Sequence, residues 1–115
     1  MKTIIAGSRS IDNYKELCNL IKESDFIITE VISGGAKGVD KLGERYAIEH
    51  NINLNIMNAQ WQLYGRSAGY IRNQQMSSYA DALILLWDGV SKGSLNMLNI
   101  ATKDKLFIYS KILSS

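Results

Sequence analysis

The chain contains a glycine-rich stretch, Ile32-Ser33-Gly34-Gly35-Ala36-Lys37-Gly38-Val39-Asp40, between a short apolar run and a segment with helical spacing. Glycine permits the positive φ angles of a tight turn and lets a ligand approach the backbone closely. A helix that begins directly after such a turn presents unpaired N–H groups and a partial positive charge. This arrangement is typical of phosphate binding in α/β proteins, so it predicts a ligand that is a nucleotide or derives from one.

Apolar runs and helical patterns alternate along the whole chain. Strands are predicted at Lys2–Ala6, Val31–Ser33, Ile52–Met57, Ala82–Trp87 and Leu106–Tyr109. Helices are predicted over Asn13–Ser24, from Val39 to about Asn51, over Gly65–Tyr79, and from Ser91 to about Lys103. Alternating strands and helices predict an α/β fold, namely a single-domain Rossmann-like three-layer sandwich over residues 1–115 with a parallel sheet of about five strands.

Composition limits the classes of function. With 115 residues, of which 46% are hydrophobic and 21% charged, the chain suits one domain with a core. No apolar run is long enough to cross a membrane and the first residues lack the pattern of a signal peptide, so we expect a cytoplasmic protein, in the host cytoplasm if a phage encodes it. The net charge is +2 and the 13 Lys and Arg residues are scattered, which disfavours nucleic acid as partner. One histidine and one cysteine disfavour a zinc site, and no cofactor or metal is expected.

The ligand site is expected beyond the carboxyl ends of the strands, where the strand order of an open α/β sheet reverses. The loops that meet there would be Gly7–Arg9, Gly34–Gly38, Asn58–Gly69 and Asp88–Ser94. These loops and the helices after them supply the candidate ligand-binding residues Gly7, Ser8, Arg9, Gly34, Gly35, Ala36, Gly38, Asp40, Trp61, Arg72, Asn73, Asp88, Ser91, Gly93 and Ser94.

Several of these residues also have an ordinary structural interpretation. Ser91 can simply cap the last helix, but Gly93 in its first turn would lower helix stability by about 1 kcal/mol relative to alanine, which favours a ligand close to the backbone. Arg9 can clamp a phosphate or lie in solvent. Asp40 can stabilise the helix dipole, accept hydrogen bonds from a ribose, or act as an acid or base. Trp61 and nearby aromatic and amide side chains suit a base, by stacking and hydrogen bonding.

Two better-known phosphate motifs are absent. The dinucleotide fingerprint Gly-x-Gly-x-x-Gly does not follow the first predicted strand, which ends at Gly7-Ser8-Arg9. The Walker motif needs Gly-Lys followed by Ser or Thr, and neither Lys37-Gly38-Val39 nor Lys92-Gly93-Ser94 has that order. An NAD-dependent dehydrogenase and a P-loop ATPase are therefore both disfavoured.

Several short motifs follow one another along the chain in a fixed order. They are Gly7-Ser8-Arg9 with Asp12, Ser33 to Asp40 with Glu44-Arg45-Tyr46-Ala47, Ala59-x-Trp61, Tyr64-Gly65, Ala68-Gly69, Arg72-Asn73 with Met76, and Trp87-Asp88-Gly89-x-Ser91-x-Gly93-Ser94. Their order and spacing, over Thr3 to about Lys105, resemble the YspA-type (DUF2493, also YAcAr) branch of the SLOG superfamily. This superfamily is named for the Smf/DprA DNA-processing proteins and the LOG cytokinin-activating enzymes.

The resemblance implies a Rossmann-like fold with a pocket for a nucleotide or a nucleotide-derived signal, such as a cyclic or ADP-ribose-type messenger in conflict between phages and bacteria. LOG enzymes cleave the N-glycosidic bond of nucleoside monophosphates and carry Pro-Gly-Gly-x-Gly-Thr-x-x-Glu at the last loop. Met97 stands where that glutamate would be. Whether this chain is an enzyme is left open: binding is favoured over hydrolysis, and a phosphoribohydrolase would have to use Asp40, Glu44 or Asp88, of which Asp40 and Glu44 are the candidate catalytic residues.

Two further expectations follow from the resemblance. Single-stranded DNA binding, as in the DprA relatives, is a third hypothesis that the charge balance disfavours. Self-association into a homo-oligomer is expected, because members of the superfamily build their sites near contacts between subunits.

Overall fold

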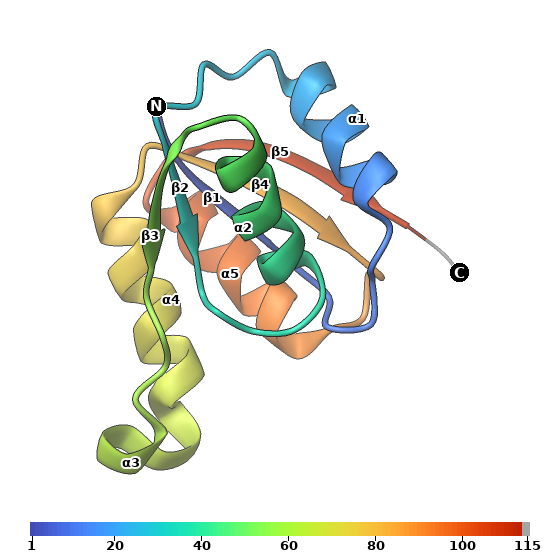
Figure 1. Ribbon diagram of the computed structural model, residues 1–115. Coiled ribbons are helices and arrows are strands. Elements are labelled where there is room, and N and C mark those ends of the chain that lie inside the picture. Colours follow the sequence, from blue (N-terminus) through green and yellow to red (C-terminus); the bar gives the residue numbers. More distant parts are fainter. Residues whose placement is uncertain (114–115) are drawn as a thin grey trace.

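The computed structural model describes residues 1–113 and shows a parallel sheet between two layers of helices (Figure 1). The strands are β1 (Lys2–Gly7), β2 (Glu30–Ser33), β3 (Asn53–Ile56), β4 (Ala82–Trp87) and β5 (Phe107–Ile112). The helices are α1 (Tyr14–Ser24), α2 (Val39–Glu49), α3 (Trp61–Tyr64), α4 (Ala68–Tyr79) and α5 (Lys92–Lys103), with a 3-10 turn η1 (Gly65–Ser67). The predicted α/β architecture is confirmed.

The strand order is β3-β2-β1-β4-β5, and all neighbouring strands are parallel. From β1 the chain passes outward to β2 and β3 on one side, and β4 and β5 lie on the other, so the order reverses between β1 and β4. All six residues of β4 are buried, as the continuous apolar run predicted. The edge strands β3 and β5 keep exposed positions, which agrees with the alternating pattern of Ile52–Met57.

Each face of the sheet packs on its own pair of helices. Alternate residues of the central strands point to opposite faces, so Ile5 and Ile84 contact the α1–α2 layer while Ile4 and Leu83 contact the α4–α5 layer. The core on the first face contains Ile5, Ile11, Leu17, Leu20, Ile21, Val31, Val39, Ala47, Ile84 and Leu86. The core on the second face contains Ile4, Ala6, Ile32, Met76, Leu83, Leu85, Trp87, Met97 and Ala101.

The helix starts follow the local sequence. Asn13 caps α1, since its side chain accepts a hydrogen bond from the N–H of Glu16 at 3.1 Å. Ser91 caps α5 in the same way through the N–H of Ser94 at 3.4 Å. Gly38 precedes α2 and offers no side chain, so the glycine stretch opens a helix whose first N–H groups no capping side chain satisfies.

Two sequence predictions differ from the structure. The helix predicted over Gly65–Tyr79 is divided, because α3 and η1 form a separate short segment before α4; we call Trp61–Ser67 the arm, and Figure 1 shows α3 extending away from the sheet. The helical spacing of this segment predicts Ala68, Ile71, Met76 and Tyr79 on the inward face; Ala68 and Met76 are buried, but Tyr79 is 38% exposed and its hydroxyl donates to Glu30. The α4 positions that are buried instead include two polar residues, Asn73 and Ser77.

Candidate functional site

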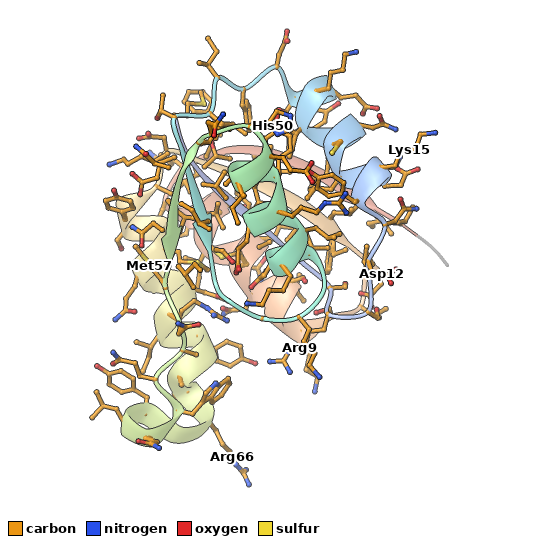
Figure 2. The ribbon with its side chains drawn as sticks, in the orientation of Figure 1. Arg9, Asp12, Lys15, His50, Met57 and Arg66 are labelled. Atoms are coloured by element: carbon orange, nitrogen blue, oxygen red, sulfur yellow. The ribbon has the colours of Figure 1, made fainter. Side chains whose placement is uncertain are left out.

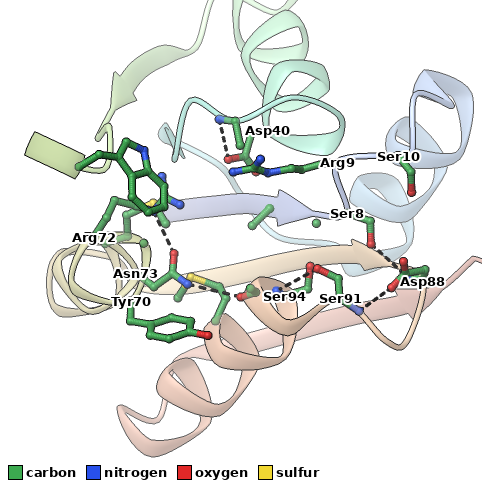
Figure 3. A pocket seen from close by; sticks show the side chains of 18 of the residues that line it. Ser8, Arg9, Ser10, Asp40, Tyr70, Arg72, Asn73, Asp88, Ser91 and Ser94 are labelled. Atoms are coloured by element: carbon green, nitrogen blue, oxygen red, sulfur yellow. Dashed lines mark hydrogen bonds between the residues drawn. The ribbon is translucent and has the colours of Figure 1, made fainter. Parts of the chain in front are cut away.

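A cavity of about 480 Å³ opens at the carboxyl ends of the strands, where β1 and β4 diverge (Figure 3). Its walls come from the loops after β1, β2 and β4, from the arm, and from the first turns of α4 and α5. The predicted site residues that line it are Gly7, Ser8, Arg9, Ala36, Asp40, Trp61, Arg72, Asn73, Asp88, Ser91, Gly93 and Ser94.

The sequence did not single out seven further lining residues. Arg66 and Tyr70 belong to the aromatic-rich segment that the sequence associated with a base, so the signal for them was present. Ser10 lies one residue beyond the predicted loop, and Met76 and Met97 have helical spacing that predicts only core packing. The full set that was missed is Ala6, Ser10, Arg66, Gly69, Tyr70, Met76 and Met97.

The glycines of the loop after β2 do not line the cavity. Gly38 has φ +76° and a Cβ on it would lie 2.3 Å from the carbonyl oxygen of Ser8. Gly35 has φ +75° and a Cβ there would lie 2.2 Å from Oδ1 of Asn58. At Gly34 a Cβ would come within 2.6 Å of Nη1 of Arg72. Gly35 and Gly38 are therefore required by the protein's own backbone, independently of any ligand, whereas a side chain at Gly34 would displace the end of Arg72.

Asp40, in the first turn of α2 directly after this glycine loop, lines the cavity. The Asp40 side chain accepts a hydrogen bond from the N–H of Ala36 at 3.1 Å and is only 6% exposed. Burial raises the pKa of Asp40 to about 6, although the Ala36 N–H and the positive charges of Arg72 and Arg9 act in the opposite direction. A carboxyl group with this pKa can release or accept a proton near neutral pH.

Glu44, the other candidate catalytic residue, does not reach the cavity. Its carboxylate accepts a hydrogen bond from the Ser33 hydroxyl at 2.7 Å and pairs with Lys41 at 3.3 Å. The structure gives Glu44 a local role in joining α2 to β2, and the negative charge of Glu44 adds to the effects that raise the pKa of Asp40.

Arg72 and Asn73 connect the loop after β2 with α5. The Arg72 guanidinium donates to the carbonyl oxygen of Gly34 and, at 3.0 Å, to Oδ1 of Asn73. The Asn73 amide donates in turn to Oδ1 of Asn96 at 2.9 Å and to the carbonyl oxygen of Gly93 at 3.4 Å. Arg72 is thereby held in place from both sides, and its partners explain why an arginine and an asparagine occupy these helical positions.

The loops after β1 and β4 are joined at the floor of the cavity. Gly7 ends β1 so close to β4 that a Cβ would lie 1.8 Å from the carbonyl oxygen of Leu86. The Ser8 hydroxyl accepts a hydrogen bond from the N–H of Asp88 at 3.0 Å. The Asp88 carboxylate accepts from the N–H groups of Val90 and Ser91 at 2.9 and 2.8 Å, and these bonds lower the pKa of Asp88 and shape the turn before α5.

The start of α5 is the polar end of the cavity. Ser94 is 4% exposed, and its hydroxyl oxygen has no hydrogen-bond partner within residues 1–113. Gly93 has no atom within 4 Å of where a Cβ would be, and its φ is not in the left-handed region, so packing does not require glycine there. Figure 3 shows Ser91 and Ser94 together on the α5 wall, opposite Arg9 and Asp40.

Aromatic residues form the other end of the cavity. Trp61 comes from the arm and Tyr70 from the first turns of α4, and they are 54% and 50% exposed. Arg66, also on the arm, is a further lining residue of the cavity. An aromatic surface that remains half exposed beside a polar cavity can stack a planar ligand group.

The described residues 1–113 contain no cluster of histidine, cysteine and acidic side chains that could hold a metal ion. None of the helices in that part of the chain has the length and apolar character needed to span a membrane.

No protein-family model and no curated protein matches the chain. Among solved structures, the chain is similar to DNA processing protein A (DprA) from Streptococcus pneumoniae, with a TM-score of 0.75 over 95% of this chain. The fold is that of a DprA-type Rossmann-like domain. The two sequences are 16% identical, and the chain spans about half the length of that DprA chain, since the match covers 49% of it. At this identity the likeness supports the fold expected for the SLOG superfamily and carries no ligand, activity or partner with it.

Proposed function

We propose that this protein binds a nucleotide or a nucleotide-derived signalling molecule in the cavity between β1 and β4. The observation that carries the proposal is the Ser94 hydroxyl, which is buried without a partner at the amino end of α5 beside an open position at Gly93. A buried hydroxyl without a hydrogen bond costs about 1–3 kcal/mol, and a phosphate oxygen at the start of the helix would provide that bond.

The rest of the cavity supports the same ligand. With a phosphate at Ser91, Gly93 and Ser94, the ribose would lie near Asp40 and the base would reach Trp61 and Tyr70. Arg72 and Asn73 form the wall between these ends, and their hydrogen bonds within the protein hold that wall in position before a ligand arrives.

The motifs that resemble the YspA-type branch support a cytoplasmic sensor or sequestering protein for a messenger of the cyclic or ADP-ribose type. We extend the proposal to a homo-oligomer that associates through the arm. The arm exposes Leu63 (68%) and Tyr64 (40%), and α3 buries none of its residues within this chain. Light scattering should show a dimer or larger species that dissociates in Leu63→Asp.

Native mass spectrometry of protein purified from cells, followed by identification of nucleotides released on denaturation, tests the ligand directly. Isothermal titration of the compounds found should then show that Ser94→Ala weakens binding tenfold or more, because one hydrogen bond to a charged group is worth roughly 1.5–3 kcal/mol. The matched control is Ser110→Ala, an exposed serine on β5 that does not line the cavity. An empty protein that also binds no compound of a nucleotide panel would contradict the proposal.

A second candidate function is cleavage of the N-glycosidic bond of a nucleoside monophosphate, favoured by the pKa of about 6 at Asp40 inside the cavity. A carboxyl group poised to exchange a proton near the ribose suits this reaction. Chromatography would show free base and ribose 5-phosphate after incubation with nucleoside monophosphates, and Asp40→Ala would abolish both products. Binding without turnover would leave the first function alone.

Single-stranded DNA remains the alternative suggested by the name of the DprA structure. A gel-shift assay at physiological salt distinguishes it, because the scattered positive charges predict no stable complex with an oligonucleotide.

A further inference from the structure

We propose that the ligand carries two phosphate groups, one bound at the start of α5 and the other between Arg9 and Arg66 at the mouth of the cavity. This inference rests on the proposed function and specifies its ligand class as a nucleoside diphosphate or a larger molecule built on a pyrophosphate. It follows from where the protein places positive charge that it does not itself neutralise.

The start of α5 already provides what a single phosphate needs. It combines the free N–H groups of a helix of 12 residues with the unpartnered hydroxyl of Ser94. Gly93 lets the ligand approach the backbone without a side chain in the way. One phosphate group is therefore accommodated without Arg9 or Arg66.

Arg9 and Arg66 line the same cavity from two different elements, the loop after β1 and the arm. Both are exposed, and Figure 2 shows Arg66 extending from the arm and Arg9 on the loop after β1. Within residues 1–113 neither guanidinium has an ion-pair partner, which is true of most Lys and Arg residues there, since the ion pairs involve Lys41, Arg45 and Lys111. Two cations at one cavity mouth thus remain available to an anion.

Arg72 is a weaker candidate for the second site, because two of its N–H groups already donate to Gly34 and Asn73. Arg72 nevertheless helps to locate the charge of Arg9. The positive charge of Arg9 lies close enough to lower the pKa of both Arg72 and Asp40. Two neighbouring guanidinium groups repel each other, and a bound phosphate would relieve this repulsion while accepting charge-assisted hydrogen bonds from Arg9.

The geometry also orients the two phosphates. In Figure 3 Arg9 lies on the wall opposite Ser91 and Ser94, so a first phosphate at α5 leaves a second phosphate facing Arg9. The base end at Trp61 and Tyr70 stays free for the nucleoside. A terminal diphosphate and a pyrophosphate ester both present two phosphate groups to the protein. Isothermal titration of ADP-ribose beside ADP tells which of these two kinds of ligand binds more tightly.

The test is isothermal titration of the mono- and diphosphates of the four common nucleosides at constant ionic strength, with EDTA to remove divalent cations. At least one diphosphate should bind roughly tenfold or more tightly than its monophosphate, the scale of one charge-assisted interaction. Arg9→Ala and Arg66→Ala should each reduce that ratio threefold or more, and the double variant should bring it close to one. Each of the three should lose more affinity for the diphosphate than for the monophosphate.

Lys22→Ala is the matched control, because it removes one positive charge at the last turn of α1, at the opposite edge of the sheet. It should leave the ratio unchanged. Equal affinities for monophosphate and diphosphate in wild type would overturn the two-phosphate inference and leave nucleotide binding intact. A ratio that survives in the double variant would overturn the placement at Arg9 and Arg66. Failure of every nucleotide to bind would overturn the proposed function together with this inference.

Discussion

Two glycine-containing loops border the cavity, and they contain glycine for different reasons. In the loop after β2, Gly35 and Gly38 have positive φ and lie against other parts of the protein, so a side chain there would be strained. After the loop that follows β4, Gly93 in the first turn of α5 faces open space in a backbone conformation that alanine adopts easily. The first loop therefore uses glycine to build the fold, and the second leaves room beside a helix end. A glycine-rich motif marks a ligand contact only where the protein itself does not need the glycine.

The largest effect should come from Gly38→Ala in the loop after β2. Gly38 has φ +76° and ψ −130°, and a Cβ would lie 2.3 Å from a backbone oxygen, so we expect the free energy of unfolding to fall by more than about 3 kcal/mol. Urea unfolding followed by circular dichroism measures this.

Gly65→Ala is a control with nearly the same backbone conformation, φ 59° and ψ −132°, but no atom within 4 Å of its Cβ position. It should show only the conformational cost, about 1–3 kcal/mol. If Gly38→Ala is no more destabilising than Gly65→Ala, the loop after β2 yields to a side chain and the contrast between the loops is lost.

The next effect concerns Asp40, which the loop after β2 holds in the cavity. Its pKa rises from 3.8 to about 6 on folding, so the folded protein binds more protons than the unfolded chain between these values. The contribution of Asp40 to the free energy of unfolding should therefore be greatest below pH 4. It should fall by about 3 kcal/mol in total as the pH rises through 6. Asp40→Asn should lack this loss.

Urea unfolding of wild type and Asp40→Asn from pH 4 to pH 8 measures the difference directly. The variant should gain stability relative to wild type as the pH rises, because it has no carboxylate to bury. Parallel pH profiles would mean that Asp40 titrates normally and would remove the physical basis for acid–base chemistry at this position.

A smaller effect is expected at Ser94 in the loop after β4. Removing a buried hydroxyl without a partner should leave stability unchanged or raise it by about 1 kcal/mol, because no hydrogen bond is lost. The same variant should lose ligand affinity. A thermal unfolding curve with a clearly lower midpoint would show that the hydroxyl has a partner in the free protein.

The smallest effect should be that of Gly93→Ala. Alanine should stabilise α5 by at most about 1 kcal/mol, opposite in sign to Gly38→Ala, while the added methyl group obstructs the ligand. Ser91→Ala on the same turn is the comparison, since loss of the cap should destabilise by about 1 kcal/mol. Destabilisation by Gly93→Ala would show that this glycine, too, serves the fold.

The sequence predicted the architecture because strand and helix patterns here are local. The run Ala82–Trp87 is apolar throughout and is buried throughout, and the glycines at the ends of β1 and β2 indicated the edge of the sheet at which the cavity opens. The order of the strands was not needed for this, since the carboxyl ends of parallel strands meet at one edge in any order.

The parts that were missed depend on partners distant in sequence. In α4 the burial of Asn73 and Ser77 was missed, because their hydrogen-bond partners Asn96 and Asp104 belong to the far end of the chain. No local pattern announces such pairs, so a helical wheel places Tyr79 inward instead. The arm was not predicted, because its helix α3 has four residues, buries none of them and so shows no hydrophobic periodicity.

The hydrogen bond between the N–H of Asp88 and the Ser8 hydroxyl joins residues 80 positions apart. The floor of the cavity thus consists of β1 and of β4, a strand that is synthesised much later than β1. On the ribosome, β1 and the glycine loop after β2 must therefore wait for β4 before the floor of the cavity can form. A chain truncated before Ala82 should accordingly lack the cavity even where its first strands are intact.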